Sequence, residues 1–253
     1  MQINLKNHIA LVTGGSGQLG RVICRTLGNC GADVVVHYHQ NSSKAQELVD
    51  ELHSKGVRSL MVQADVTNED SIQAMKSIVE AELGSPDIIV NNAVIQYKWV
   101  HVLVQNPADY ESQFRSCVMH NVLMAQAFTP AMIAKQWGRI IAINTECAMQ
   151  NFPDQSAYVA GKRGMDGVLR VLAKEIGEHQ ITVNQVAPGW MISENFPDGN
   201  SEMELAYKAN IPLKRRGFDQ DIANLVAFLA SDLANFISGQ YISVSGGNVM
   251  PTI

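Results

Sequence analysis

Three side chains between residues 145 and 162 could together move a proton to or from an oxygen atom. Tyr158 and Lys162 are four residues apart, so on a helix they project from the same face. An ammonium beside a phenol favours the phenolate, which predicts a pKa for Tyr158 below its free value of about 10. Such a pair can act as an acid or a base near neutral pH. With the hydroxyl of Thr145, these groups could hold and protonate a carbonyl oxygen.

The residues around these side chains predict a strand, a loop and a helix, in that order. Residues 140–143 form a short β-branched run that is typical of a buried strand. The polar stretch that contains Pro153 indicates a loop, and the apolar periodicity that begins near Tyr158 indicates a long helix. A tyrosine and a lysine at this spacing often occur by chance, so their meaning depends on the rest of the chain.

A glycine-rich turn follows the first predicted strand. Residues 8–13 form an apolar run, residues 14–20 read GGSGQLG, and apolar residues then recur at helical spacing from Leu19. A strand, a glycine turn and a helix in this order place free backbone N–H groups and the positive helix end against a phosphate. The glycines let the backbone approach a pyrophosphate closely. This segment therefore predicts a nucleotide-binding turn.

The rest of the chain alternates between predicted strands and helices. Further strands are expected at residues 32–38, 59–64, 88–90, 181–186 and 240–244, and helices at 42–55, 67–82, 107–135 and 219–230, with a short helical stretch near 202–208. This alternation predicts an α/β fold: a Rossmann-type, doubly wound parallel sheet of about seven strands with helices on both faces. We expect one domain over residues 1–253, with ligands at the carboxyl ends of the strands.

Composition excludes several classes of protein. The chain has 253 residues, 46% of them hydrophobic, and a net charge of −5, so a role based on neutralising nucleic-acid phosphates is not expected. The basic cluster at residues 214–216 is interpreted as a solvated face or a loop. The amino terminus lacks the pattern of a signal peptide, and no apolar run has the length to span a bilayer. We therefore expect a cytoplasmic protein that does not bind membranes.

The cysteines and histidines give no sign of disulfides or metal ligands. The four cysteines, Cys24, Cys30, Cys117 and Cys147, form no C-x-x-C pair and are expected to be free thiols. His37 and His39 alternate across a strand end with no carboxylate or thiol beside them, so no metal site is expected.

With these motifs in place, the chain resembles the compact, single-domain members of the short-chain dehydrogenase/reductase family over essentially its whole length. Each motif alone is weak, but the combination of their order and spacing is specific. The matching residues are Thr13-Gly14, Gly20, Asp65-Val66, Asn91-Asn92-Ala93, Asn121, Thr145, Tyr158-x-x-x-Lys162, Pro188-Gly189 and Gly246-Gly247.

The resemblance implies an oxidoreductase that transfers a hydride between NAD(P)(H) and a small to medium carbonyl or secondary alcohol. Tyr158 would donate the proton in reduction and accept it in oxidation. Lys162 would lower the pKa of Tyr158 and bind the nicotinamide ribose, and Thr145 would orient the substrate oxygen. Asn121 would bind a water that links Lys162 to solvent; the alternative is a solvated or kink-forming helix residue.

The resemblance also implies the residues of the cofactor site. Asp65 would face the adenine, unless it only caps a turn, and Asn91 would lie on the adenosine ribose side. Ser193 would lie near the carboxamide or pyrophosphate, although a simple loop serine fits nearly as well. The full set is Gly14, Ser16, Gln18, Leu19, Gly20, Tyr38, His39, Ser42, Asp65, Val66, Asn91, Ala93, Tyr158, Lys162, Pro188, Gly189 and Ser193.

The end of the second strand favours NADP(H) over NAD(H). NAD-preferring enzymes place Asp or Glu there, whereas this chain has Tyr38 between two histidines. His39, Ser42 and Ser43 could donate to a 2′-phosphate, and the run HYHQNSS is similar to that of NADP-dependent pteridine reductases. Gly17 argues the other way, because many NADP enzymes have a basic residue at its position. NAD(H) therefore stays open.

Three residues depart from the family pattern: Gln18 and Val94 replace glycines, and Thr145 replaces serine. Gln18 would crowd the phosphates or hydrogen-bond to them. These departures leave a second interpretation open, a catalytically weak NADP-binding redox sensor or scaffold. The substrate pocket is expected at residues 94–99, 147–152 and 190–196.

The family usually forms homotetramers, so a homotetramer or homodimer is expected. Four apolar residues fit a helix interface and fit the internal core equally well: Met119, Leu123, Leu169 and Leu172.

Overall fold

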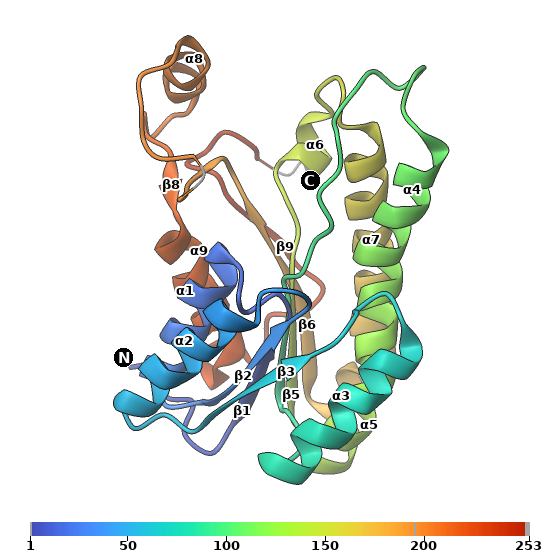
Figure 1. Cartoon of the computed structure of the whole chain (residues 1–253), viewed down its shortest axis with the longest axis vertical. Helices are drawn as coiled ribbons and strands as arrows, with labels where there is room; N and C mark the ends of the chain where they lie inside the picture. Colours follow the sequence, from blue (N-terminus) through green and yellow to red (C-terminus); the bar gives the residue numbers. More distant parts are fainter. Residues whose placement is uncertain (1, 195, 251–253) are drawn as a thin grey trace.

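A parallel β-sheet lies at the centre of the molecule. The computed structural model describes residues 2–194 and 196–250, and within these residues seven strands form one sheet (Figure 1). The strands are β1 (Ile9–Val12), β2 (Asp33–Tyr38), β3 (Ser59–Gln63), β4 (Ile88–Asn91), β5 (Gly138–Ile143), β6 (Ile181–Pro188) and β9 (Tyr241–Val244). Every pair is parallel, in the order β3-β2-β1-β4-β5-β6-β9, which confirms the predicted doubly wound sheet.

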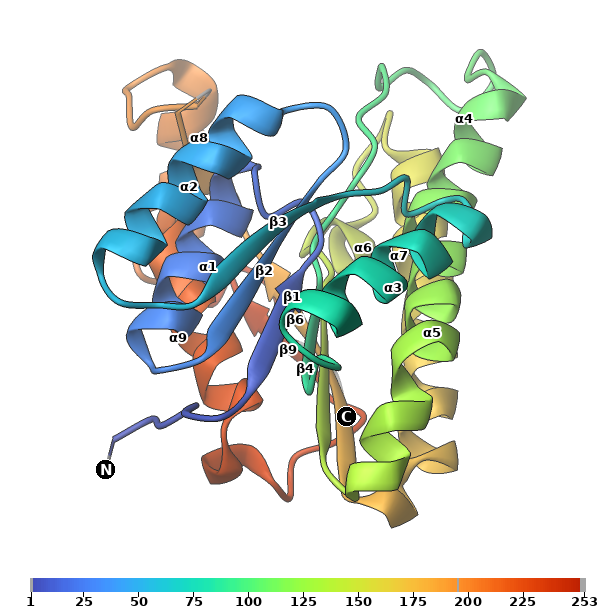
Figure 2. The ribbon, with the colours of Figure 1, turned by 60° about the horizontal axis from the view of Figure 1, so that its bottom comes forward.

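Helices cover both faces of the sheet (Figures 1 and 2). One layer contains α1 (Gln18–Asn29), α2 (Ser42–Ser54) and α9 (Asp219–Ala230); the other contains α3 (Glu69–Glu82), α5 (His120–Lys135) and α7 (Ser156–Glu175). Strand residues alternate between the two cores, because successive side chains point to opposite faces. In β2, for example, Val34 and Val36 pack under α1 and α2, whereas Val35 packs under α3 and α5.

The predicted helix at residues 107–135 is continuous but not regular. It consists of α4 (Pro107–Gln113), a π-helical segment (Phe114–Met119) and α5. By length and composition it could cross a membrane, contrary to the expectation that no segment would. However, 56% of its most apolar window is buried inside the molecule, and α5 packs against β4 and β5, as a core helix does.

The connection from β6 to α9 leaves the main sheet and contains elements of its own. We call residues 189–218, of which Asn195 lies outside the described residues, the β6–α9 segment. It contains β7 (Met191–Ile192), α8 (Glu202–Asn210) and β8 (Gly217–Phe218), and β7 pairs with β8 in a two-stranded parallel sheet that the sequence did not predict. Figure 1 shows α8 above the carboxyl ends of the strands. A short helix, α6 (Cys147–Gln150), lies in the predicted loop after β5.

Candidate active site

A cavity of about 620 Å³ opens at the carboxyl edge of the sheet, where the strand order reverses between β1 and β4. Its size is in the range of small-molecule and cofactor sites. It is lined by residues that follow six of the strands: Gly14, Ser16, Gly17, Gln18, Leu19, Gly20, His37, His39, Gln40, Asn41, Asp65, Val66, Thr67, Asn92, Ala93, Val94, Ile95, Ser116, Ile143, Asn144, Thr145, Tyr158, Lys162, Pro188 and Gly189.

The two ends of the glycine turn, residues 14–20, lie so close together that their backbones are in contact. Gly14 has φ +62°, in the left-handed region, and a Cβ on Gly20 would overlap the carbonyl oxygen of Gly14. Within the described residues, no side chain caps the N-terminus of α1, which begins at Gln18 beside the cavity. Its free N–H groups therefore fit the pyrophosphate of a dinucleotide.

Side chains from the neighbouring strands hold this turn, and the sequence analysis did not assign them that role. His37 accepts a hydrogen bond at Nδ1 from the Gly14 N–H (2.9 Å) and contacts the Ala64 carbonyl through Nε2 (3.1 Å). Burial lowers the pKa of His37 to about 4, so the ring is neutral and Nε2–H donates to Ala64. Asn92 Nδ2 donates to the carbonyls of Thr13 (3.0 Å) and Gly14 (3.3 Å).

Gln18 lines the cavity, but its amide is bonded elsewhere. Its Nε2 donates to Asp219 Oδ2 (2.5 Å) at the start of α9, and its Oε1 accepts from the Glu194 N–H (2.8 Å). Because Gln18 also lines the cavity, its contact with a phosphate stays a prediction. This residue ties the glycine turn to the β6–α9 segment.

The cavity wall includes His39, Asp65 and Val66, for which cofactor contacts are predicted, and also Gln40, Asn41 and Thr67, for which none is. The Asp65 carboxylate accepts from the Thr67 N–H (2.9 Å) and hydroxyl (2.7 Å). These two bonds are those of a residue that caps a turn, which is the alternative interpretation of Asp65. Asp65 also lies at the cavity wall, a position that suits a contact with an adenine.

Several predicted cofactor residues do not line the cavity. Tyr38 packs against the core, and Ser42 is the first residue of α2. Asn91 is buried and donates through Nδ2 to Asn121 Oδ1 (2.7 Å). Ser193 Oγ accepts from the Phe196 N–H (2.9 Å) within its own loop, which matches the simpler interpretation of this serine.

Thr145, Tyr158 and Lys162 all line the cavity, from β5's end and the first turns of α7. Lys162 Nζ donates to the Ile143 carbonyl (2.6 Å) and lies 5.7 Å from the centre of the Tyr158 ring. Burial raises the pKa of Tyr158 above its ordinary value, opposite to the expected direction, and burial lowers the pKa of Lys162. Desolvation thus outweighs the cationic neighbour, and the phenol retains its proton.

Asn121 braces the long helix at its π-helical segment. Its Nδ2 donates to the Cys117 carbonyl (2.6 Å), one turn earlier, while its Oδ1 accepts from Asn91. Asn121 does not line the cavity, and its bonds match the alternative of a helix-distorting residue. The segment it braces brings Ser116 to the cavity wall, a contact for which the sequence contains no signal.

The loop after β4 brings two aromatic side chains to Tyr158. Tyr97 Oη accepts from the Tyr158 N–H (2.7 Å), which caps the first turn of α7, and Trp99 stacks on the Tyr158 ring with centroids 6.0 Å apart. Of the three stretches predicted to line a substrate pocket, only Val94 and Ile95 line the main cavity.

The sheet order, the glycine turn and the cavity at the strand reversal define a dinucleotide-binding α/β protein. A family model described as Enoyl-(Acyl carrier protein) reductase matches residues 16–248. The chain is 37% identical over 254 residues to a 3-oxoacyl-(acyl-carrier-protein) reductase of Staphylococcus epidermidis, covering 96% of this chain and all of that one.

Two solved structures are similar over nearly the full length. A gluconate 5-dehydrogenase from Burkholderia cenocepacia, in complex with NADP and tartrate, has a TM-score of 0.90 at 26% identity, covering 98% of this chain and 97% of that one. A 7α-hydroxysteroid dehydrogenase complexed with NADH and 7-oxo glycochenodeoxycholic acid has a TM-score of 0.92 at 29% identity, covering 99% and 97%.

The chain belongs to the short-chain dehydrogenase/reductase family. It is an NAD(P)-dependent oxidoreductase that interconverts carbonyl and secondary alcohol groups on small molecules.

Proposed function

We propose that Tyr158 is the acid in carbonyl reduction and the base in alcohol oxidation. The observation that carries this proposal is the convergence of Thr145, Tyr158 and Lys162 on one cavity. The Thr145 hydroxyl positions the carbonyl oxygen, and the protonated Tyr158 donates its proton to that oxygen. A bound nicotinamide supplies the hydride that the carbonyl carbon receives. Lys162, held by the Ile143 carbonyl, places a positive charge near the phenol and favours the phenolate left after proton transfer.

The cofactor is bound by the glycine turn at its pyrophosphate and by His39, Asn41 and Asp65 at its adenosine end. NADP(H) is preferred, because residues 37–43 contain no carboxylate to repel a 2′-phosphate. Lys44, in the first turn of α2, adds a positive charge near this end. A kcat/KM ratio of NADPH to NADH above about 10 is expected, and equal values would overturn this preference.

The substrate is a small to medium ketone. The 3-oxoacyl thioesters are the first candidates, since the Staphylococcus relative is named for that substrate class. The decisive experiment uses purified protein with NADPH and NADH against a panel of 3-oxoacyl thioesters, sugars, steroids and simple ketones. Turnover that is lost in Tyr158→Phe, with NADPH binding retained, is expected. NADPH binding without turnover of any of these carbonyls would instead support a redox sensor or scaffold.

We further propose that the protein is a cytoplasmic, single-domain homotetramer or homodimer. Its four cysteines are free thiols, which suits a reducing compartment. A groove between α5 and α7, which contains Val122, Val168 and the half-exposed Val171, offers an apolar helix face for a second copy. Leu123 and Leu169 are buried in the core, so they do not contribute to it. Sedimentation as a monomer at micromolar concentration would reject the oligomer.

A further inference from the structure

Arg216 is buried in the β6–α9 segment, although it follows Lys214 and Arg215 in a cluster that the sequence analysis interpreted as a solvated face or a loop. Arg216 does lie in a loop, but only 1% of it is exposed, so a solvated face is wrong for this residue. Arg215, by contrast, has a half-exposed side chain that pairs with Asp221. Arginines are seldom buried unless their charge and N–H groups have partners, so the contacts of Arg216 explain why it differs from Arg215.

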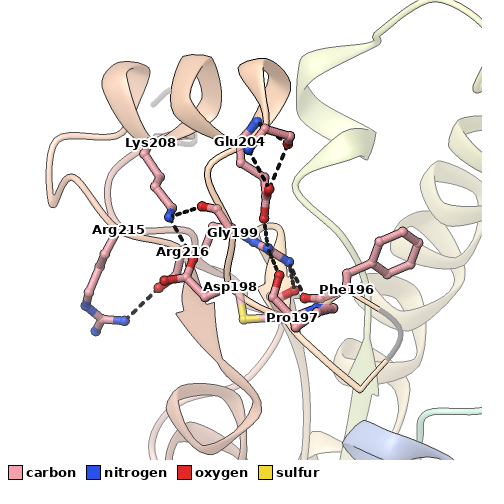
Figure 3. A network of polar contacts seen from close by, with 10 residues as sticks. Phe196, Pro197, Asp198, Gly199, Glu204, Lys208, Arg215 and Arg216 are labelled. Atoms are coloured by element: carbon pink, nitrogen blue, oxygen red, sulfur yellow. Dashed lines mark hydrogen bonds and ion pairs between the residues drawn. The ribbon is translucent and has the colours of Figure 1, made fainter.

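The guanidinium of Arg216 donates four hydrogen bonds to the β6–α9 segment (Figure 3). Nη1 donates to the Pro197 carbonyl (3.0 Å) and to Glu204 Oε1 (2.7 Å). Nη2 donates to the carbonyls of Met191 (2.6 Å) and Phe196 (2.9 Å). Three of the acceptors are backbone carbonyls of Met191, Phe196 and Pro197, so one planar cation fixes the chain at these three residues.

The same guanidinium lies over the ring of Trp190, 4.3 Å from its centre. Tyr207 of α8 meets the indole edge-on, with ring centroids 5.2 Å apart. The Tyr207 Oη accepts a hydrogen bond from the backbone N–H of Trp190 (2.7 Å). Trp190 directly follows Gly189, which lines the cavity. The indole is therefore held by a cation and a phenol at the point where the chain leaves the cavity.

The network reaches back to the residue after Thr145. Tyr207 Oη donates to Glu146 Oε1 (2.6 Å), and Asn248 Nδ2 donates to Glu146 Oε2 (3.0 Å). A Cβ on Gly189 would lie 2.8 Å from Tyr207 Oη and 3.1 Å from Glu146 Oε2, so only glycine lets these groups approach the chain. The pose of Trp190 is thereby linked to the strand end that carries Thr145.

We propose that Arg216 is a positioning residue: it sets the pose of Trp190 and of Met191, Phe196 and Pro197. These residues do not line the cavity themselves, but they adjoin Gly189, which does, and through it they set the shape of that side of the cavity. The proposal rests on the proposed function in assigning this side to the carbonyl substrate. His37 and Asn92 hold the cofactor turn from the sheet, and Gln18 also joins it to Glu194 of the β6–α9 segment. We expect the contacts from the sheet to keep the turn in place without Arg216.

The test compares Arg216→Met with the matched control Arg215→Met. A single change at residue 216 leaves Glu204 buried without its cation, and the protein can then fail to fold. The double variant Arg216→Met/Glu204→Gln removes both charges and keeps a side chain at residue 204 that can complete the Ser201 capping box. It is therefore the decisive variant.

We expect the melting temperature of the double variant to lie within a few degrees of the wild-type value, while its KM for the ketone rises at least about 10-fold. Its NADPH dissociation constant stays within about twofold, and Arg215→Met leaves all three values unchanged. A purely structural ion pair predicts instead that the double variant recovers both stability and KM. That outcome, or an unchanged KM, overturns the proposal.

A readout without turnover separates this inference from the proposed function. Substituting Trp99 and Trp137 by Phe leaves Trp190 as the single tryptophan. We expect acrylamide quenching of its emission to increase at least about twofold on adding Arg216→Met/Glu204→Gln, and to be unchanged on adding Arg215→Met. Equal quenching in all three proteins overturns the proposal, even if no carbonyl substrate has been found.

Discussion

The two sides of the cavity are held in place by different kinds of contact. On the cofactor side, the turn after β1 is bonded by residues of the two strands next to it: His37 from β2, and Asn92 directly after β4. On the substrate side, the contacts join loops and helices outside the sheet. Tyr97 meets Tyr158, and Arg216 meets Trp190.

The buried polar groups of the two sides also differ in charge. His37 is neutral on the cofactor side, where it bonds backbone groups only. The substrate side contains the buried carboxyl of Glu146 and the buried guanidinium of Arg216. The comparison teaches that the sheet holds the turn through neutral side chains, whereas the opposite wall contains buried ionisable side chains. Charged groups reach the turn only from outside the sheet, as Asp219 does through Gln18 and as Arg21 does at Ser16. The two sides should therefore respond differently to substitution and to pH.

The largest effect is expected at the boundary between the two sides. Tyr158→Phe removes the only proton that we assign to the substrate oxygen, so kcat/KM for reduction should fall by about 10³-fold. The NADPH dissociation constant should change less than about twofold, as titrated by NADPH fluorescence. Tyr110→Phe is the control, because its hydroxyl bonds Ser156 outside the cavity. Comparable losses in both variants would show that the phenol has no special role.

The glycine turn allows the sharpest test of the cofactor side. Gly20→Ala forces a methyl group against the carbonyl of Gly14, so we expect a loss of about 1–3 kcal/mol in the free energy of unfolding. NADPH affinity should fall at least about 10-fold. Gly177→Ala, at a site where an added Cβ meets nothing, should leave both values nearly unchanged. Urea titration and fluorescence binding measure them, and intact affinity in Gly20→Ala would contradict a tight turn.

The cofactor side was the more predictable one, because its signals are local. Apolar runs of three or four residues mark β1, β2 and β5, and the glycines of residues 14–20 require close backbone approach. The helical spacing of Tyr158 and Lys162 likewise places both side chains at the cavity. His37 was missed as a turn contact, although a polar residue inside the run VVVHY could have indicated a buried hydrogen bond.

The substrate side was less predictable, because its contacts depend on tertiary structure. Arg216 resembles its exposed neighbours in sequence, and its burial requires Glu204 and three carbonyls to be brought together. The π-helical segment before Asn121 has no sequence signal. The pKa direction of Tyr158 was wrong for a related reason: the helical spacing reveals the neighbouring cation, but not the desolvation that outweighs it.

The pH dependence of stability tests the neutral character of the cofactor side. The folded pKa of His37 is about 4, below its unfolded value of about 6.5. The unfolded chain therefore binds the proton first, and stability falls by up to about 3 kcal/mol as pH drops from 6.5 to 4. His120 acts in the same direction, so the measurement is the difference between wild type and His37→Asn. The variant should lose less stability on acidification, and parallel pH profiles would contradict a neutral buried ring.

Glu146 on the substrate side should show a smaller effect of opposite sign. Burial raises the pKa of this carboxyl, and the bonds from Tyr207 and Asn248 offset only part of the shift. The folded protein therefore binds the proton more tightly than the unfolded chain, and the contribution to stability is lost as pH rises from the unfolded value of about 4.3. Glu146→Gln retains an acceptor for Tyr207 but cannot ionise.

Relative to Glu146→Gln, the wild type should thus lose stability between pH 4.5 and 7, as measured by urea unfolding at both values. Relative to His37→Asn, the wild type should gain stability between pH 4.5 and 7 in the same measurement. If both differences had the same sign, the contrast between a neutral cofactor side and an ionisable substrate side would fail. Opposite signs would show that one cavity is held by two elements with opposed pH dependence, so its two walls are most stable at different pH values.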